Sequence, residues 1–106
     1  MKLADENCKL LKTGDLPLSP EEAKELSLEI PRWTLGEKTI EKEFSFKNFL
    51  QSMDFVNQVA DLAEKQNHHP DIFISYSQVK LVLSTHKVGG LSRNDFILAA
   101  KIDLLI

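Results

Sequence analysis

The chain has 106 residues, 42% of them hydrophobic and 27% charged, which is enough to bury the core of one soluble domain, residues 1–106. Its net charge of −3 argues against the basic surface of proteins that bind nucleic acid directly, so we expect no such contact. No stretch approaches the roughly 20 apolar residues of a membrane span, and the polar start and single cysteine, Cys8, favour a cytoplasmic protein.

The first predicted helix follows a lead-in segment, residues 1–18, whose scattered charges and leucines indicate partial order and little function. Ser19 is expected to be the N-cap and Pro20 the first helical residue. The helix should continue to about Glu29, because Pro31 stops it. Its apolar stripe consists of Ala23, Leu26 and Ile30.

Two strands and a long helix are predicted next. The strands are residues 33–35 and 40–46, around a turn at residues 36–38. Lys42 falls on the apolar face of the second strand, beside Ile40, Phe44 and Phe46. The helix, residues 47–66, is the longest element, because apolar residues recur through it at helical spacing. They are Phe49, Leu50, Met53, Val56, Val59, Ala60 and Ala63.

A β-hairpin follows the long helix, with strands at residues 72–76 and 79–83 and a two-residue turn at residues 77–78. Pairing extrapolated outward from this turn brings His69 opposite His86. The turn lacks the glycine or Asn-Gly pair that fixes a short hairpin. A slip of one residue would turn His86 to the opposite face of the sheet.

The last predicted element is a helix that begins after a glycine turn. Ser92 is its expected N-cap, and Asp95 stands at the third position of a capping box. Its apolar face comprises Phe96, Ile97, Ala100 and Leu104. The element order is therefore α-β-β-α-β-β-α. Because the strands come in consecutive pairs, we predict an α+β two-layer sandwich, a four-stranded antiparallel sheet with helices on one face.

One face of the predicted hairpin mixes apolar and polar side chains, namely Phe73, Ser75, Lys80 and Val82. An uncovered sheet face or an unpaired edge strand favours association with another chain. We therefore expect a homo-oligomer.

All three histidines of the chain, His68, His69 and His86, fall in or beside the hairpin. Neutral imidazole moves protons well near neutral pH, so their convergence would indicate general acid–base chemistry on a small substrate. They could equally be unrelated polar loop residues. Three imidazoles could also bind zinc, but adjacent ligands such as His68 and His69 project differently and suit one ion poorly.

Other candidate site residues surround the histidines in the sequence. Glu64 lies one helical turn before His68 and could orient it or be a solvated helix residue. Asp95 is explained by its capping box unless other observations intervene, and Tyr76 could line a pocket or belong to the core. Nucleophilic catalysis is disfavoured, because Cys8 lies in the lead-in segment and the serines lack a glycine-flanked elbow.

These residues together resemble the signature of the pterin-4a-carbinolamine dehydratase family, also called dimerization cofactor of a homeodomain transcription factor. An acidic residue stands four before a His-His-Pro, followed by an aromatic residue, a histidine and an aspartate. In this sequence the signature is carried by Glu64, His68, His69, Pro70, Tyr76, His86 and Asp95. The resemblance extends from about residue 31 to the C-terminus.

The resemblance implies the predicted fold, assembled as dimers or tetramers, and catalysis without a metal or organic cofactor. It implies loss of water from a 4a-hydroxytetrahydropterin to give quinonoid dihydropterin, which recycles the cofactor of aromatic amino-acid hydroxylases. The active-site histidines of the family match His68, His69 and His86, and its aspartate matches Asp95. The competing interpretation is a non-catalytic binding or coactivator module on the same fold.

Overall fold

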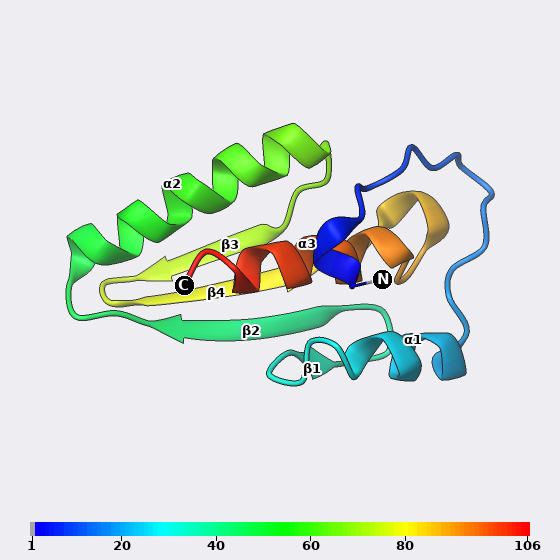
Figure 1. The fold of residues 1–106 in the computed structure, drawn as a ribbon, viewed down its shortest axis with the longest axis horizontal. Coiled ribbons are helices and arrows are strands. Elements are labelled where there is room, and N and C mark those ends of the chain that lie inside the picture. The colour runs from blue at the N-terminus through cyan, green and yellow to red at the C-terminus, as the bar shows by residue number, and fades with distance from the viewer. Residues whose placement is uncertain (1) are drawn as a thin grey trace.

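The computed structural model describes residues 2–106 and has the predicted α+β element order (Figure 1). Two short 3₁₀ helices add to it, one near the N-terminus and one after the hairpin. In chain order the elements are η1 (Leu3–Asp5), α1 (Pro20–Ser27), β1 (Thr34–Leu35), β2 (Ile40–Ser45), α2 (Phe49–Gln66), β3 (Asp71–Ser75), β4 (Gln78–Leu83), η2 (His86–Val88) and α3 (Arg93–Asp103).

The four strands form one antiparallel sheet in the order β1-β2-β4-β3, so β4 is a central strand. Alternate residues of β4 are buried, namely Val79, Leu81 and Leu83, and on β2 Ile40 and Phe44 share their face. The helices cover this face. The residues that alternate with the buried ones along β2 and β4 face the other way and are more exposed. The predicted two-layer arrangement is confirmed. Its physical reason is that one face of the sheet is apolar, and only that face needs to be covered by helices.

The hairpin of β3 and β4 forms as predicted, but its turn lies one residue earlier than residues 77–78. Ser75 pairs with Gln78, so the turn residues are Tyr76 and Ser77. Tyr76 has a φ of 51°, and positive φ at turn residues matches the twist of the two strands. The register therefore differs from the predicted one by two residues, and each side chain keeps its expected face.

Helix α2 begins two residues later than predicted, because the Asn48 side chain caps it by accepting from the backbone N–H of Gln51 at 2.9 Å. Its buried face is Ser52, Phe55, Val56, Val59 and Ala63. Phe49 and Leu50 are 48% and 79% exposed, and Ala60 is exposed too, so these three of the apolar residues at helical spacing lie outside the buried face. Only one stripe of the helix contacts the rest of the domain.

The one charged residue on the apolar face of β2, Lys42, forms an ion pair with the C-terminal end of α3. Lys42 Nζ lies 2.9 Å from Asp103 Oδ1, which also accepts from Trp33 Nε1 at 3.1 Å. The predicted position of Lys42 on that face is thus compatible with burial. Leu104, predicted on the buried face of this helix, follows its end and is 75% exposed.

The lead-in segment, predicted to be partly ordered, packs on α3 throughout η1. Leu3 is fully buried and belongs to the core. Glu6 accepts two hydrogen bonds from the Arg93 guanidinium, which lowers the pKa of the Glu6 carboxyl from its ordinary value. Leu3 is therefore held by tertiary contacts, which local sequence patterns do not reveal, whereas Leu10 and Leu16 are 79% and 89% exposed. Among the described helices, none has both the length and the apolar composition needed to cross a membrane.

Candidate functional site

An open cavity of about 540 Å³ lies where the end of α2, the segment after β4, the start of α3 and the N-terminal segment meet. The structure brings all three histidines to its wall. The residues lining it are Cys8, Lys9, Leu10, Leu11, Lys65, Gln66, Asn67, His68, His69, Ser84, Thr85, His86, Lys87 and Asn94. The cavity is therefore built from segments that are distant in the sequence.

Local backbone geometry delivers the histidines to the cavity from two directions. Asn67 is the C-cap of helix α2 and adopts the left-handed conformation with φ 51° and ψ 41°. His68 and His69 follow on the connection to β3. His86 begins η2, a single turn that ends at Val88 and has Gly89, with φ 70°, as its C-cap.

The predicted direct pairing of His69 with His86 across an extended hairpin is wrong. The observed register, continued outward, places residue 84 rather than His86 opposite His69. β4 ends at Leu83, and the turn of η2 carries His86 to the cavity wall instead. The turn of η2, and not strand pairing, therefore brings His86 to the same cavity as His68 and His69.

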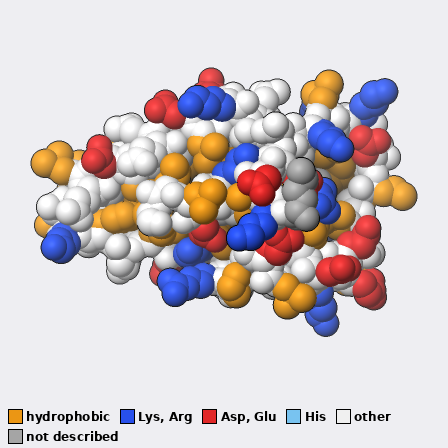
Figure 2. Space-filling view, viewed as in Figure 1, with side chains coloured by type: hydrophobic (Ala, Val, Ile, Leu, Met, Phe, Trp, Pro, Cys, Tyr) orange, Lys and Arg blue, Asp and Glu red, His pale blue; other side chains and the backbone are white. Residues whose placement is uncertain are grey.

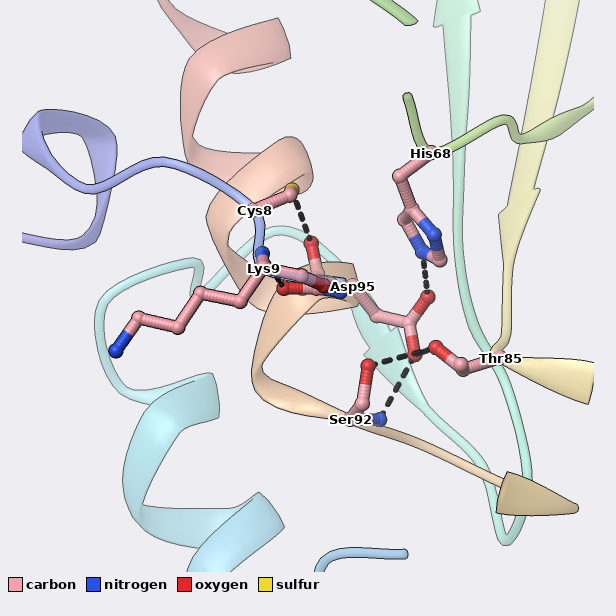
Figure 3. A network of polar contacts seen from close by, with 7 residues as sticks. Cys8, Lys9, His68, Thr85, Ser92 and Asp95 are labelled. Atoms are coloured by element: carbon pink, nitrogen blue, oxygen red, sulfur yellow. Dashed lines mark hydrogen bonds and ion pairs between the residues drawn. The ribbon is translucent and has the colours of Figure 1, made fainter. Parts of the chain in front are cut away.

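His68 is held by a buried carboxylate (Figure 3). Its Nε2 lies 2.6 Å from Asp95 Oδ1, and the two side chains are 12% and 0% exposed. Asp95 Oδ2 accepts from Thr85 Oγ1 at 2.8 Å and from the backbone N–H of Ser92 at 2.9 Å. An ionised carboxylate only accepts hydrogen bonds, so Nε2 of His68 carries the hydrogen, and in the neutral ring Nδ1 is the acceptor.

Glu64 contacts His69, and not His68 as the sequence spacing had suggested. Glu64 Oε2 lies 2.5 Å from His69 Nε2. The two side chains are 78% and 55% exposed, so solvent weakens this pair compared with the buried contact of His68. His69 is therefore the less restrained of the two adjacent rings.

Tyr76 does not line the cavity. It lies in the β3–β4 turn, at the end of the hairpin away from His69, and is 67% exposed. Asp95 lies behind His68 and combines two roles, helix capping and support of the ring. Sequence reasoning had treated these roles as alternatives.

Sequence reasoning missed the contribution of three polar residues. Thr85 and Ser92 complete the shell of the buried carboxylate, and their hydroxyls lie 2.7 Å apart. Asn94 lines the cavity and bonds to Lys9, which is 85 residues away in the chain. Ser92 was expected only as a helix cap, and the other contacts depend on tertiary structure.

Cys8 lies at the cavity wall with its thiol protonated. Burial, with the negative charge of Asp95 as a second cause, raises the pKa of the thiol from 9.0 to about 11.

Thiolate is the reactive form, so alkylation of folded protein at pH 8 should be about 100-fold slower than that of a free cysteine. Iodoacetamide labelling followed by mass spectrometry measures this. Equal rates for native and urea-unfolded protein would contradict it.

Within residues 2–106, no group of three or more histidine, cysteine and acidic residues is arranged to hold a metal ion. His68 and His69 each contact a different carboxylate. The arrangement can bind a small polar molecule and exchange protons with it through imidazole.

Known proteins match this chain over nearly its whole length. A family model described as pterin 4 alpha carbinolamine dehydratase matches residues 16–105. A protein of Nitrosomonas eutropha, provisionally named a pterin-4-alpha-carbinolamine dehydratase, is 46% identical over 98% of this chain and 93% of its own. One from Rubrobacter xylanophilus with the same provisional name is 42% identical, covering 98% of both chains.

Two solved structures share the fold. A transcriptional coactivator/pterin dehydratase from Brucella melitensis has a TM-score of 0.79 and 32% identity, covering 84% of this chain and 97% of that one. A pterin dehydratase-like protein described as a RuBisCO assembly factor in the α-carboxysome has a TM-score of 0.57 and 25% identity, covering 70% and 86%. The extent of the family match and the identity of the relatives show that this chain belongs to the pterin-4-alpha-carbinolamine dehydratase family.

Proposed function

We propose that the protein is a hydro-lyase that removes water from a 4a-hydroxytetrahydropterin and releases quinonoid dihydropterin. The observation that carries this proposal is the convergence of His68, His69 and His86 on one cavity, with His68 fixed by a buried aspartate. In the reaction the C4a–oxygen bond breaks, the N5 proton is removed, and a C4a–N5 double bond forms. The hydroxyl leaves as water after it receives a proton.

We assign the two proton transfers to His69 and His86, and the binding of the hydroxyl or orientation of the ring to His68. In support, His69 is 55% exposed on its side chain, whereas the His68 side chain is 12% exposed and its ring is tied to Asp95. A fixed ring suits binding, while a ring that exchanges protons with substrate and solvent benefits from access. No group other than these side chains is needed for the proton balance.

The decisive experiment is a stopped-flow dehydration assay with purified protein and enzymatically generated 4a-hydroxytetrahydropterin. The substrate also dehydrates without a catalyst, so the rate in buffer is subtracted. We expect the rate to rise in proportion to protein concentration. A rate that stays at the buffer value would refute the proposal.

Catalysis is expected to persist after exhaustive chelation, because adjacent histidines suit a single metal ion poorly. Metal analysis of the active protein before and after chelation, with the same assay, checks this. Stoichiometric zinc whose removal abolishes turnover would contradict it.

We place this reaction in the cytoplasm, in the recycling of a tetrahydropterin such as tetrahydrobiopterin for an aromatic amino-acid hydroxylase. A second candidate is a binding or coactivator module, and the coactivator and assembly-factor descriptions of the two structural relatives favour it. The dehydration assay separates the two, because a module that only binds a partner has no physical need for proton transfer.

Self-association through the hairpin is the expected assembly. On the outer face of the sheet, Phe73 is 55% exposed, and Lys80 Nζ lies 5.4 Å from its ring centroid. The face seen in Figure 2 also intermixes hydrophobic side chains with charged ones. Light scattering at micromolar concentration should give at least twice 12.0 kDa, and Phe73→Asp should lower this mass. A wild-type monomer would count against the proposal.

A further inference from the structure

Part of the cavity wall comes from the N-terminal segment. Residues 8–11, here called the N-terminal strap, all line the cavity together with the three histidines. Figure 3 shows Cys8 and Lys9 passing beside the start of α3, next to the carboxylate that holds His68. The family match begins only at residue 16, so the strap lies outside the part of the chain that defines the family.

The strap is anchored by the side chain of Asn94. Asn94 Oδ1 accepts from the backbone N–H of Lys9 at 2.9 Å, and Asn94 Nδ2 donates to the Lys9 carbonyl at 2.7 Å. Asn94 is only 7% exposed, so solvent competes little for these bonds. A second anchor is Gln66, whose Oε1 accepts from the backbone N–H of Cys8 at 2.8 Å.

The anchors belong to the same elements that position His68. Asn94 directly precedes Asp95 on α3, and Gln66 is the last residue of α2, two before His68. The strap is therefore held in a defined position relative to the histidine that Asp95 orients. Within the strap Cys8 packs against the core, but Leu10 is 79% exposed, so core packing does not account for the position of the whole strap.

Apart from Lys9, which is charged and exposed and also lines the cavity, the strap presents apolar groups. Leu10 is 79% exposed and lines the cavity, Leu11 is partly buried, and the Cys8 thiol is protonated. A pterin has a flat ring whose faces are less polar than its edges. Histidines suit the reacting edge, and an apolar wall suits a ring face, where it gains from burial.

We propose that the N-terminal strap is part of the pterin-binding site, packing Leu10 on the ligand, and that Asn94 is the positioning residue that holds it there. This inference rests on the proposed function for the identity of the ligand. It assigns a binding role to a segment whose sequence alone indicates little function.

Two variants and a matched control test the strap. Leu10→Ala trims the wall without touching the core, and Asn94→Ala releases the strap. Each should raise KM and the Kd for 7,8-dihydrobiopterin, measured by calorimetry, about tenfold, with a smaller change in kcat. Leu28→Ala removes an equally exposed leucine, 78% against 79%, at the end of α1, away from the cavity, and should leave both constants unchanged.

The readouts separate this inference from the proposed function. Circular dichroism checks that the Asn94→Ala protein is folded. Leu10→Ala tests the strap independently, even if Asn94→Ala does not fold. If wild-type protein turns over and both variants bind dihydrobiopterin as tightly as wild type, the strap inference is overturned alone. If wild-type protein binds dihydrobiopterin without turnover and Leu10→Ala weakens binding, only the dehydratase proposal fails. Wild-type protein that binds no pterin overturns the strap assignment.

Discussion

His69→Ala and His86→Ala should each lower the catalysed rate of pterin dehydration by about 10² to 10⁴, the usual loss when a general acid or base is removed. The physical reason is that hydroxide leaves C4a poorly unless it is protonated, and N5 must lose a proton as the double bond forms. Because both rings line the cavity proposed to bind the pterin, their loss should lower kcat more than it weakens pterin binding. His68→Ala, by contrast, should mainly raise KM.

Stopped-flow rates corrected for the buffer reaction measure these effects, with circular dichroism to confirm folding. Gln58→Ala, at an exposed position of α2 away from the cavity, serves as a control that should retain wild-type turnover. The visible loss is limited by the uncatalysed background, which must be measured for each preparation. Wild-type turnover in both histidine variants would defeat the catalytic assignment and favour the binding-module interpretation.

Asp95→Ala should lower both stability and activity. Its carboxylate is fully buried and accepts from His68, Thr85 and Ser92. Removing it leaves buried donors without partners, each costing about 1–3 kcal/mol, so the free energy of unfolding should fall by about 2–4 kcal/mol. Urea unfolding monitored by circular dichroism measures this, with exposed Asp61→Asn on α2 as the control.

Asp95→Asn separates the two roles of the carboxylate. The amide has the same shape and keeps one acceptor oxygen, so it should retain more stability than Asp95→Ala. An amide nitrogen facing His68 Nε2 would require that nitrogen to accept, which moves the ring hydrogen to Nδ1. Substrate binding and turnover should therefore fall more than stability does. Full activity in Asp95→Asn would show that Asp95 acts only as a helix cap.

Elements whose signals are local were predictable from the sequence. Ser19 and Pro20 mark the start of α1 as predicted, and Glu22 completes a capping box with Ser19. The period of α2 predicted a helix of nearly the observed length, and the consecutive strand pairs predicted the antiparallel sheet. Caps and periodicity are short-range interactions, which neighbouring residues decide among themselves.

The hairpin shows where local signals end. Its two strands were predicted, but residues 77–78 carry no residue that demands a particular turn. The observed turn is tied to β2, because Phe46 N donates to the Ser77 carbonyl at 2.7 Å. A partner strand more than 30 positions away thus fixes which residues turn, although the alternation of side chains already fixed their faces.

The sequence by itself predicted four residues of the candidate site, the three histidines and Asp95, because their residue types and spacing carry the family signature. Only the tertiary structure decided their partners. His68 pairs with Asp95 across 27 positions and Asn94 with Lys9 across 85, while Glu64 turns to His69. Such contacts depend on how helices and strands pack, and no pattern along the chain encodes a distance between segments that meet only after folding.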